Sequence, residues 1–254
     1  MLILLPPSEG KTPAKTGNPA NLSELSFPEL TSARQEVARA LASVSSQEDA
    51  LTQLGVGASL HQEVRRNTRL AGEPAAPAHS IYTGVLFDAL GYHGMTAAQK
   101  RKADSAVVVV SGLWGAVGFA DRIPAYRLSM SVGLPGLGKL ASFWKPKLAA
   151  ALLAYTEGQL LVDCRSSTYA AAWVPDPERT VAVNVFTERD GVRKVVSHFA
   201  KHTRGELARH LLTRRGMAPE TPEQLRRAAA EKWNVELISG TARKAHALNI
   251  ILTD

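Results

Sequence analysis

Three short apolar runs along the chain predict strands that are buried on both faces. They are residues 2–5, 107–110 and 160–163. Four consecutive valines make the second run a central strand, because β-branched side chains pack well in a sheet that is covered on both sides. Two further pairs of strands follow. Residues 180–186 and 193–198 predict a hairpin around Arg189, Asp190 and Gly191, and residues 233–238 and 246–252 predict the last two strands.

Helical periodicity and capping residues predict helices between these strands. The predicted helices are residues 28–44, 46–54, 58–70, 137–157, 199–215 and 221–232. We expect the fourth to be broken near Pro146. Residues 71–80 are rich in alanine and proline and predict a flexible joint. The order of elements has no regular βαβ repeat, so we expect a mixed α/β (α+β) fold, with a central mixed sheet, surrounding helices and a single domain over residues 1–254.

Composition excludes several classes of protein. The chain has 254 residues, enough for a sizeable core, and one cysteine, which excludes a disulfide framework and a multi-cysteine metal site. Pro6 and Pro7 end the first apolar run after five residues, too early for an export signal. The other apolar runs are too short to cross a membrane. We therefore expect a soluble, cytoplasmic protein with no membrane partner.

The net charge of +7, from 30 Lys and Arg against 23 Asp and Glu, favours an anionic partner. Nucleic acid, a phosphorylated small molecule and an anionic membrane surface all fit, and so does a protein that is merely basic. The excess of positive charge lies beyond residue 95. A regional excess suits a lined groove better than a basic tail.

The segment after the first strand ends like a phosphate-binding P-loop, in a Gly-Lys-Thr sequence at residues 10–12. The motif also needs an earlier glycine, where this chain has Leu5, and a following helix, where it has Pro13. We therefore reject a nucleotide hydrolase. Ser8 and Lys11 remain as candidate functional residues at the end of a strand.

Residues 51–57 have the hydrophobic and glycine spacing of a helix-hairpin-helix DNA-binding element. Gly55 and Gly57 would allow a tight turn whose backbone N–H groups approach a phosphate. The alternative is an ordinary packing corner between two helices. Residues 133–139 are a second, weaker candidate.

Polar residues beyond residue 120 supply further candidates for anion binding. They are Tyr126, Arg127, Arg165, Lys201 and Arg204. Lys201 and Arg204 flank the apolar stripe of a predicted helix, where they either cover the core or line a cleft and bind phosphates. The seven histidines show no metal-ligand spacing, so we expect no metal and no cofactor. Cys164, beside Arg165, is either an activated thiol or a buried inert one.

These segments together resemble the YaaA family of peroxide-stress proteins. The matching pieces are residues 1–4 with Pro7, Ser8 and Lys11, then 82–84, 111–115, 126–128 with Met130, Phe143 with Trp144, and 199–201 with Arg204 and Gly205. The resemblance runs nearly end to end. It implies a compact fold peculiar to the family, with a positively charged cleft and a helix-hairpin-helix element. It also implies binding of duplex DNA with little sequence preference, and a role in limiting oxidative damage and free iron.

Three hypotheses follow. In the first, the protein binds duplex or distorted DNA in a cleft, where Tyr126 or Trp114 stacks on an unpaired base. The residues expected to converge there and bind phosphates are Ser8, Lys11, Arg127, Arg165, Lys201 and Arg204. In the second, the cleft belongs to an enzyme acting on a nucleotide, a damaged base or a phosphorylated metabolite. Its candidate catalytic residues are Lys11, Tyr82, Asp163 and Lys201. In the third, the protein binds a metabolite or a protein partner, and its charge serves solubility.

Overall fold

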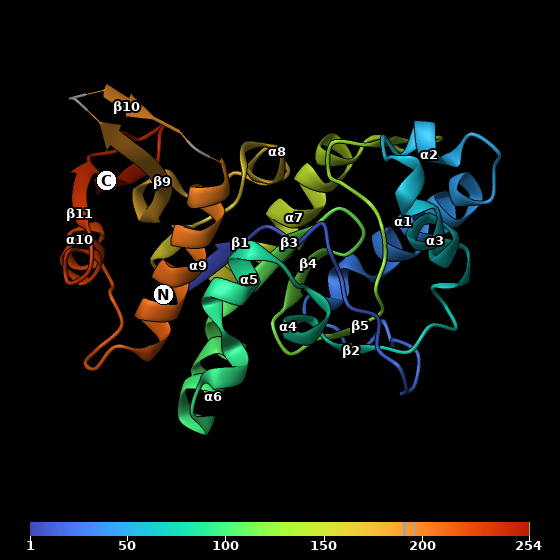
Figure 1. Ribbon diagram of the computed structural model, residues 1–254, viewed down its shortest axis with the longest axis horizontal. Coiled ribbons are helices and arrows are strands. Elements are labelled where there is room, and N and C mark those ends of the chain that lie inside the picture. Colours follow the sequence, from blue (N-terminus) through green and yellow to red (C-terminus); the bar gives the residue numbers. More distant parts are fainter. Residues whose placement is uncertain (190–191, 196, 254) are drawn as a thin grey trace.

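The computed structural model describes residues 1–189, 192–195 and 197–253, and a sheet of eight strands lies at its centre (Figure 1). The strand order is β11-β12-β9-β8-β1-β3-β4, with β10 paired to β9. The strands are β1 (Leu2–Leu5), β3 (Val107–Ser111), β4 (Gly115–Gly118), β8 (Leu161–Asp163), β9 (Thr180–Arg189), β10 (Val192–Lys194), β11 (Asn234–Ile238) and β12 (His246–Thr253). Two small pairs complete the strands: β2 (Ala76–Pro77) with β5 (Arg122–Ile123), and β6 (Gly133–Leu134) with β7 (Gly138–Lys139). The predicted mixed α/β fold with a central mixed sheet is confirmed.

The middle of the sheet is parallel and fully buried. β1 lies between β3 and β8 and is parallel to both, with Ile3 opposite Val107 on one side and Val162 on the other. All four residues of β1 are buried, which explains why its sequence is continuously apolar rather than alternating. Because β1, β3 and β8 run in the same direction, their carboxyl ends lie at one edge of the sheet. The candidate functional site described below lies at that edge, beyond β1 and β8.

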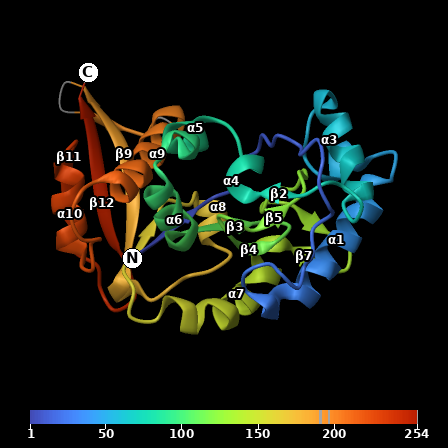
Figure 2. The same cartoon turned by 90° about the horizontal axis from the view of Figure 1, so that it is seen from below.

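Ten α-helices surround the sheet in the described part of the chain. They are α1 (Thr31–Ser45), α2 (Ala50–Gln53), α3 (His61–Arg66), α4 (Ala78–Ile81), α5 (Val85–Leu90), α6 (Ala97–Ala106), α7 (Leu140–Thr156), α8 (Ser167–Ala170), α9 (Ser197–Thr213) and α10 (Pro222–Ala230). Figure 2 shows α5 and α9 on one side of the sheet and α7 on the other. None of the described helices has the length and apolar character needed to cross a bilayer.

Helix α9 is held close to α5 by a glycine. A Cβ atom built on Gly205 would lie 2.1 Å from the carbonyl oxygen of Leu86, so a residue with a side chain does not fit there. The predicted apolar stripe of α9 faces the core, with Ala200, Thr203 and Leu207 buried. This packing fixes the side of α9 that carries Lys201 and Arg204.

Two predictions about local structure are wrong. Helix α7 continues through Pro146. Both Pro146 and Ser142 are exposed, so the carbonyl group that the proline leaves without an N–H partner can reach water. Residues 71–80 are not a free joint, because Ala75 and Ala78 are fully buried and β2 pairs with β5.

The helix-hairpin-helix prediction is not confirmed. α2 has only four residues, and Gly55 follows it with a φ of 64°. Gly57 is extended and leads into a 3-10 turn before α3 begins. The predicted hairpin at 180–198 forms between β9 and β10, although its tip at 190–191 lies outside the described residues. Its second strand ends at Lys194, and His198 belongs to α9.

Candidate functional site

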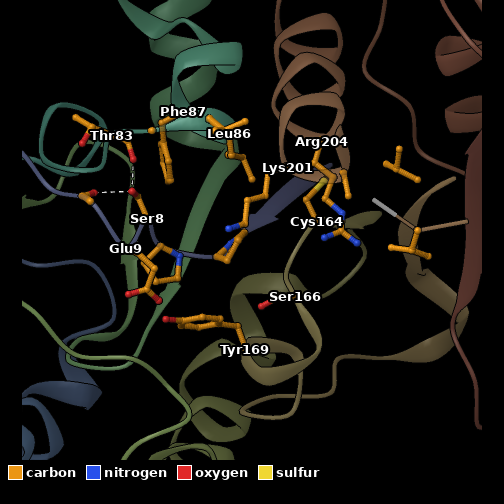
Figure 3. A pocket seen from close by; sticks show the side chains of 18 of the residues that line it. Ser8, Glu9, Thr83, Leu86, Phe87, Cys164, Ser166, Tyr169, Lys201 and Arg204 are labelled. Atoms are coloured by element: carbon orange, nitrogen blue, oxygen red, sulfur yellow. Dashed lines mark hydrogen bonds between the residues drawn. The ribbon is translucent and has the colours of Figure 1, made fainter. Parts of the chain in front are cut away.

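A cavity of about 460 Å³ lies at the carboxyl edge of β1 and β8, and we call it the main cavity (Figure 3). Its wall comes from five regions far apart in the sequence: the loop after β1, the start of α5, the end of β8 with α8, the middle of β9, and Val195 with the first turns of α9. The lining residues are 6–10, 83–87, Cys164, Ser166, Tyr169, 184–186, Val195, Ala200, Lys201 and Arg204. A cavity of this size and position is typical of ligand sites in α/β proteins.

The loop after β1 is fastened to the segment before α5. The Ser8 hydroxyl donates a hydrogen bond to the carbonyl oxygen of Thr83, and the Thr83 N–H donates to the carbonyl of Gly10. Lys11 forms a β-bridge with Tyr82. Pro6 and Pro7 end β1 and turn the chain into this loop. The loop after β1 and the segment before α5, which form neighbouring walls of the main cavity, are therefore joined by hydrogen bonds.

Lys11 lies behind this loop, against buried tyrosines. Its Nζ donates to the carbonyl oxygen of Ser8 at 2.7 Å and lies 4.3 Å from the centre of the Tyr126 ring. Burial lowers the pKa of Lys11 to about 7. Tyr126 Oη is 3.1 Å from Tyr82 Oη and 2.6 Å from Ser111 Oγ. Burial raises the pKa of both tyrosines, so they are neutral phenols that share a hydrogen-bond chain.

Lys201 and Arg204 lie on the α9 side of the main cavity. Lys201 is exposed, so its ammonium is accessible to an anion. Arg204 donates from Nε and Nη2 to the carbonyl oxygen of Val183, at 3.1 and 2.8 Å, which holds its guanidinium against β9. Cys164 is fully buried, and burial raises the pKa of its thiol to about 12. The inert form of the cysteine is therefore the one present.

Arg165 and Asp163 do not face the main cavity as free groups. Arg165 donates from Nε to one oxygen of the Asp163 carboxylate at 2.8 Å and from Nη2 to the other at 2.7 Å. The guanidinium also lies over the Trp173 ring, and the side chain is 1% exposed. A carboxylate held by two charge-assisted hydrogen bonds is poorly placed to exchange protons with a substrate. The Arg165 N–H also donates to the Asp163 carboxylate at 3.0 Å, so these contacts fix the conformation of the chain at the end of β8.

Arg127 lines a second hollow of about 430 Å³, which we call the side hollow. Its guanidinium pairs with Glu9, Nη2 to Oε2, at 3.0 Å, and its backbone is held by Asn67 through hydrogen bonds of 2.9 Å in both directions. Gly55 also lines the side hollow, whereas Gly57 lies beyond it. Glu9 belongs to both linings, so the two hollows adjoin.

The fold thus brings together only part of the predicted set. Ser8, Lys201 and Arg204 line the main cavity, Lys11 and Tyr126 lie behind its wall, Arg127 and Gly55 line the side hollow, and Arg165 is buried beside Asp163. Sequence reasoning missed Glu9, Thr83, Phe87, Tyr169 and Asn184 as lining residues. The only available signals were the position of Glu9 between Ser8 and Lys11 and the polar run after β8.

The described residues contain no set of side chains arranged to bind a metal ion. Within 1–189, 192–195 and 197–253, no group of three or more histidine, cysteine, aspartate or glutamate side chains is arranged to hold an ion. The carboxylates near the main cavity are instead neutralised by arginine, Glu9 by Arg127 and Asp163 by Arg165. The site therefore offers hydrogen bonding, positive charge and apolar surface.

Comparison with known proteins identifies a family over most of the chain. The family model described as peroxide stress protein YaaA matches residues 1–237. A UPF0246 protein of Streptomyces coelicolor is 47% identical over 230 residues, which cover 89% of this chain and 87% of that protein. A UPF0246 protein of Corynebacterium efficiens is 42% identical and covers 84% of this chain and 85% of its own length. The chain belongs to the YaaA (UPF0246) family of peroxide stress proteins.

Proposed function

We propose that the protein binds DNA, duplex or distorted and with little sequence preference, and thereby limits oxidative damage during peroxide stress. The observation that carries the proposal is the pairing of an apolar-walled cavity with two cations of α9, Lys201 and Arg204, at its side. Membership of a peroxide-stress family supports the physiological setting. The net charge of +7 supplies long-range attraction to a polyanion.

The two cations suit different roles in such binding. Lys201 is exposed on a flexible stem and acts as a point charge toward phosphate. Arg204 is fixed by Val183 and presents the rest of its guanidinium in one orientation. Contacts of this kind fix the position of the nucleic acid and carry no sequence information, which agrees with weak sequence preference.

The test is a titration of a fluorescent duplex by anisotropy between 50 and 200 mM salt. We expect affinity to fall steeply with salt, because each neutralised phosphate contributes about −0.9 to the slope of log K against log salt. Lys201→Ala should reduce that slope by about one. The matched control is Lys145→Ala, an exposed lysine on α7, on the other side of the sheet (Figure 2). A flat salt dependence would refute DNA binding.

Lys11 supports a second candidate, an enzyme acting on damaged DNA. With a pKa of about 7, a large fraction of this amine is neutral at physiological pH and able to attack an aldehyde such as that of an abasic site. The Nζ–carbon bond would form, the carbonyl oxygen would leave as water, and an imine would result. This candidate requires the loop of Ser8 and Glu9 to move, because Lys11 now lies behind it. Asp163, held by two hydrogen bonds from Arg165, is poorly placed to act as its acid or base.

Borohydride reduction on abasic-site DNA distinguishes the two functions. A trapped covalent adduct that Lys11→Met abolishes and Lys201→Met preserves would establish the enzyme. Equal binding of the DNA without any adduct would leave binding alone as the function.

A further inference from the structure

We propose that the main cavity receives one nucleotide turned out of the stack of bound DNA, and that Val195 and Phe199 fill the place it leaves. This inference rests on the DNA binding proposed above and specifies what part of the DNA the cavity takes. The cavity volume of about 460 Å³ lies within the range of sites for small organic ligands. A volume of this size suits a single base rather than a base pair.

The walls suit a flat, aromatic ring. Pro6, Pro7, Leu86 and Phe87 contribute apolar surface. In Figure 3, Leu86 and Phe87 lie at the top of the group of lining side chains and Tyr169 lies at the bottom. A base outside the helix loses its stacking partners, and apolar or aromatic walls on both sides replace part of that interaction.

Polar groups lie at both ends of the main cavity, in positions that separate a base from its phosphate. Ser8 and Glu9 lie toward one end in Figure 3, and Arg204 toward the other. The Glu9 carboxylate is half-exposed and can accept a hydrogen bond from the amino group of a base. Lys201 and Arg204 provide the positive charge that a phosphate requires. A nucleotide laid along this axis satisfies both ends.

Two exposed apolar side chains lie at the edge of the main cavity. Val195, which lines it, is 69% exposed, and Phe199 in the first turn of α9 is 51% exposed. Phe199 is two residues from Lys201 and adjoins Ala200 of the cavity wall. Exposed apolar side chains next to a cationic rim are costly in water. They match the wedges that other proteins insert between base steps when they distort DNA.

Two duplexes of the same flanking sequence test the inference, one fully paired and one with a single unpaired 2-aminopurine nucleotide. Affinity is measured by anisotropy, and base stacking by 2-aminopurine fluorescence. We expect the bulged duplex to bind at least tenfold more tightly and its fluorescence to change on binding. Ser166→Trp fills the main cavity from an exposed position and should abolish the preference, so that the two duplexes bind with equal affinity. Ser167→Trp, at the next exposed position, is the control.

The outcomes separate this inference from the function on which it rests. Equal affinity for both duplexes, with a steep salt dependence, would overturn the extrahelical nucleotide and leave DNA binding intact. Binding of neither duplex would overturn both. Preference retained in folded Ser166→Trp would place the nucleotide elsewhere and also overturn the inference. Phe199 is exposed, so Phe199→Ala leaves the core intact. It should reduce the preference for the bulged duplex severalfold. An unchanged preference would show that Phe199 does not act as a wedge.

Discussion

Gly205 of α9 faces the carbonyl oxygen of Leu86 of α5 so closely that a Cβ atom on the glycine would lie 2.1 Å from that oxygen. The contact joins two walls of the main cavity, since Leu86 lines one and Lys201 and Arg204, on the preceding turn, line the other. The width of the site therefore depends on the absence of a side chain at Gly205.

Gly205→Ala should destabilise the protein by about 2–3 kcal/mol, because the backbone of α5 cannot yield as a flexible side chain would. In an unconstrained helix the same change stabilises by about 1 kcal/mol, so the sign itself is informative. Urea unfolding provides the measurement. Gly57→Ala is the control, since its added Cβ meets nothing within 4 Å, and it should be near neutral. Equal effects of the two changes would contradict the close approach.

Lys11 should make stability depend on pH. Burial lowers its pKa from 10.5 to about 7, so between these values the unfolded chain binds a proton that the native chain has released. The free energy of unfolding contributed by this group therefore rises with pH across that window, and the penalty is complete below pH 7. Its size should be on the order of 2 kcal/mol, allowing for water around the partly exposed side chain.

The measurement for Lys11 is urea unfolding of the wild type and Lys11→Met at pH 6.5, 7.5 and 8.5. As pH rises, the free energy of unfolding of the wild type should increase relative to that of Lys11→Met. Lys15→Met, a change at another lysine of the same loop region, is the control. A constant difference for Lys11→Met would show that the lysine titrates normally.

Asp163→Asn should cost about 3–5 kcal/mol, because it leaves the buried guanidinium of Arg165 without a carboxylate. The double variant with Arg165→Met should recover part of this loss. Both are measured by thermal and urea unfolding, with DNA affinity determined on the folded fraction. We expect that affinity to be unchanged in the double variant. A loss of affinity with stability intact would instead assign the Asp163–Arg165 pair to the binding site.

Cys164 should resist modification in the native protein. It is fully buried and burial raises the pKa of its thiol to about 12, so little thiolate is present at neutral pH. An aromatic disulfide reagent should react on the timescale of unfolding and yield one equivalent in denaturant, the chain's single cysteine. Rapid reaction of the folded protein would show that Cys164, which lines the main cavity, becomes accessible without unfolding.

Local pattern was sufficient for the elements that form the sheet centre. The apolar runs at β1, β3 and β8 and the stripe on α9 follow from burial on both faces and from helical periodicity. Pattern was not sufficient for pairings between side chains. Nothing in the sequence states that Arg165 turns back to Asp163 or that Arg127 reaches Glu9, and these pairings remove two predicted cations from the main cavity. Phe87 and Asn184 line the cavity because α5 and β9, far apart in the sequence, come together in the fold, which local pattern does not reveal.

The position of β1 in the sheet also constrains how the molecule forms. Leu2 pairs with Leu161, so β1 can meet β8 only after all the residues between them have been made. Contacts between such distant segments slow folding. A fragment that ends before β8 lacks one of the two neighbours of β1 and also lacks Cys164 and the rest of the later cavity wall, so the centre of the sheet and the wall of the main cavity are completed together.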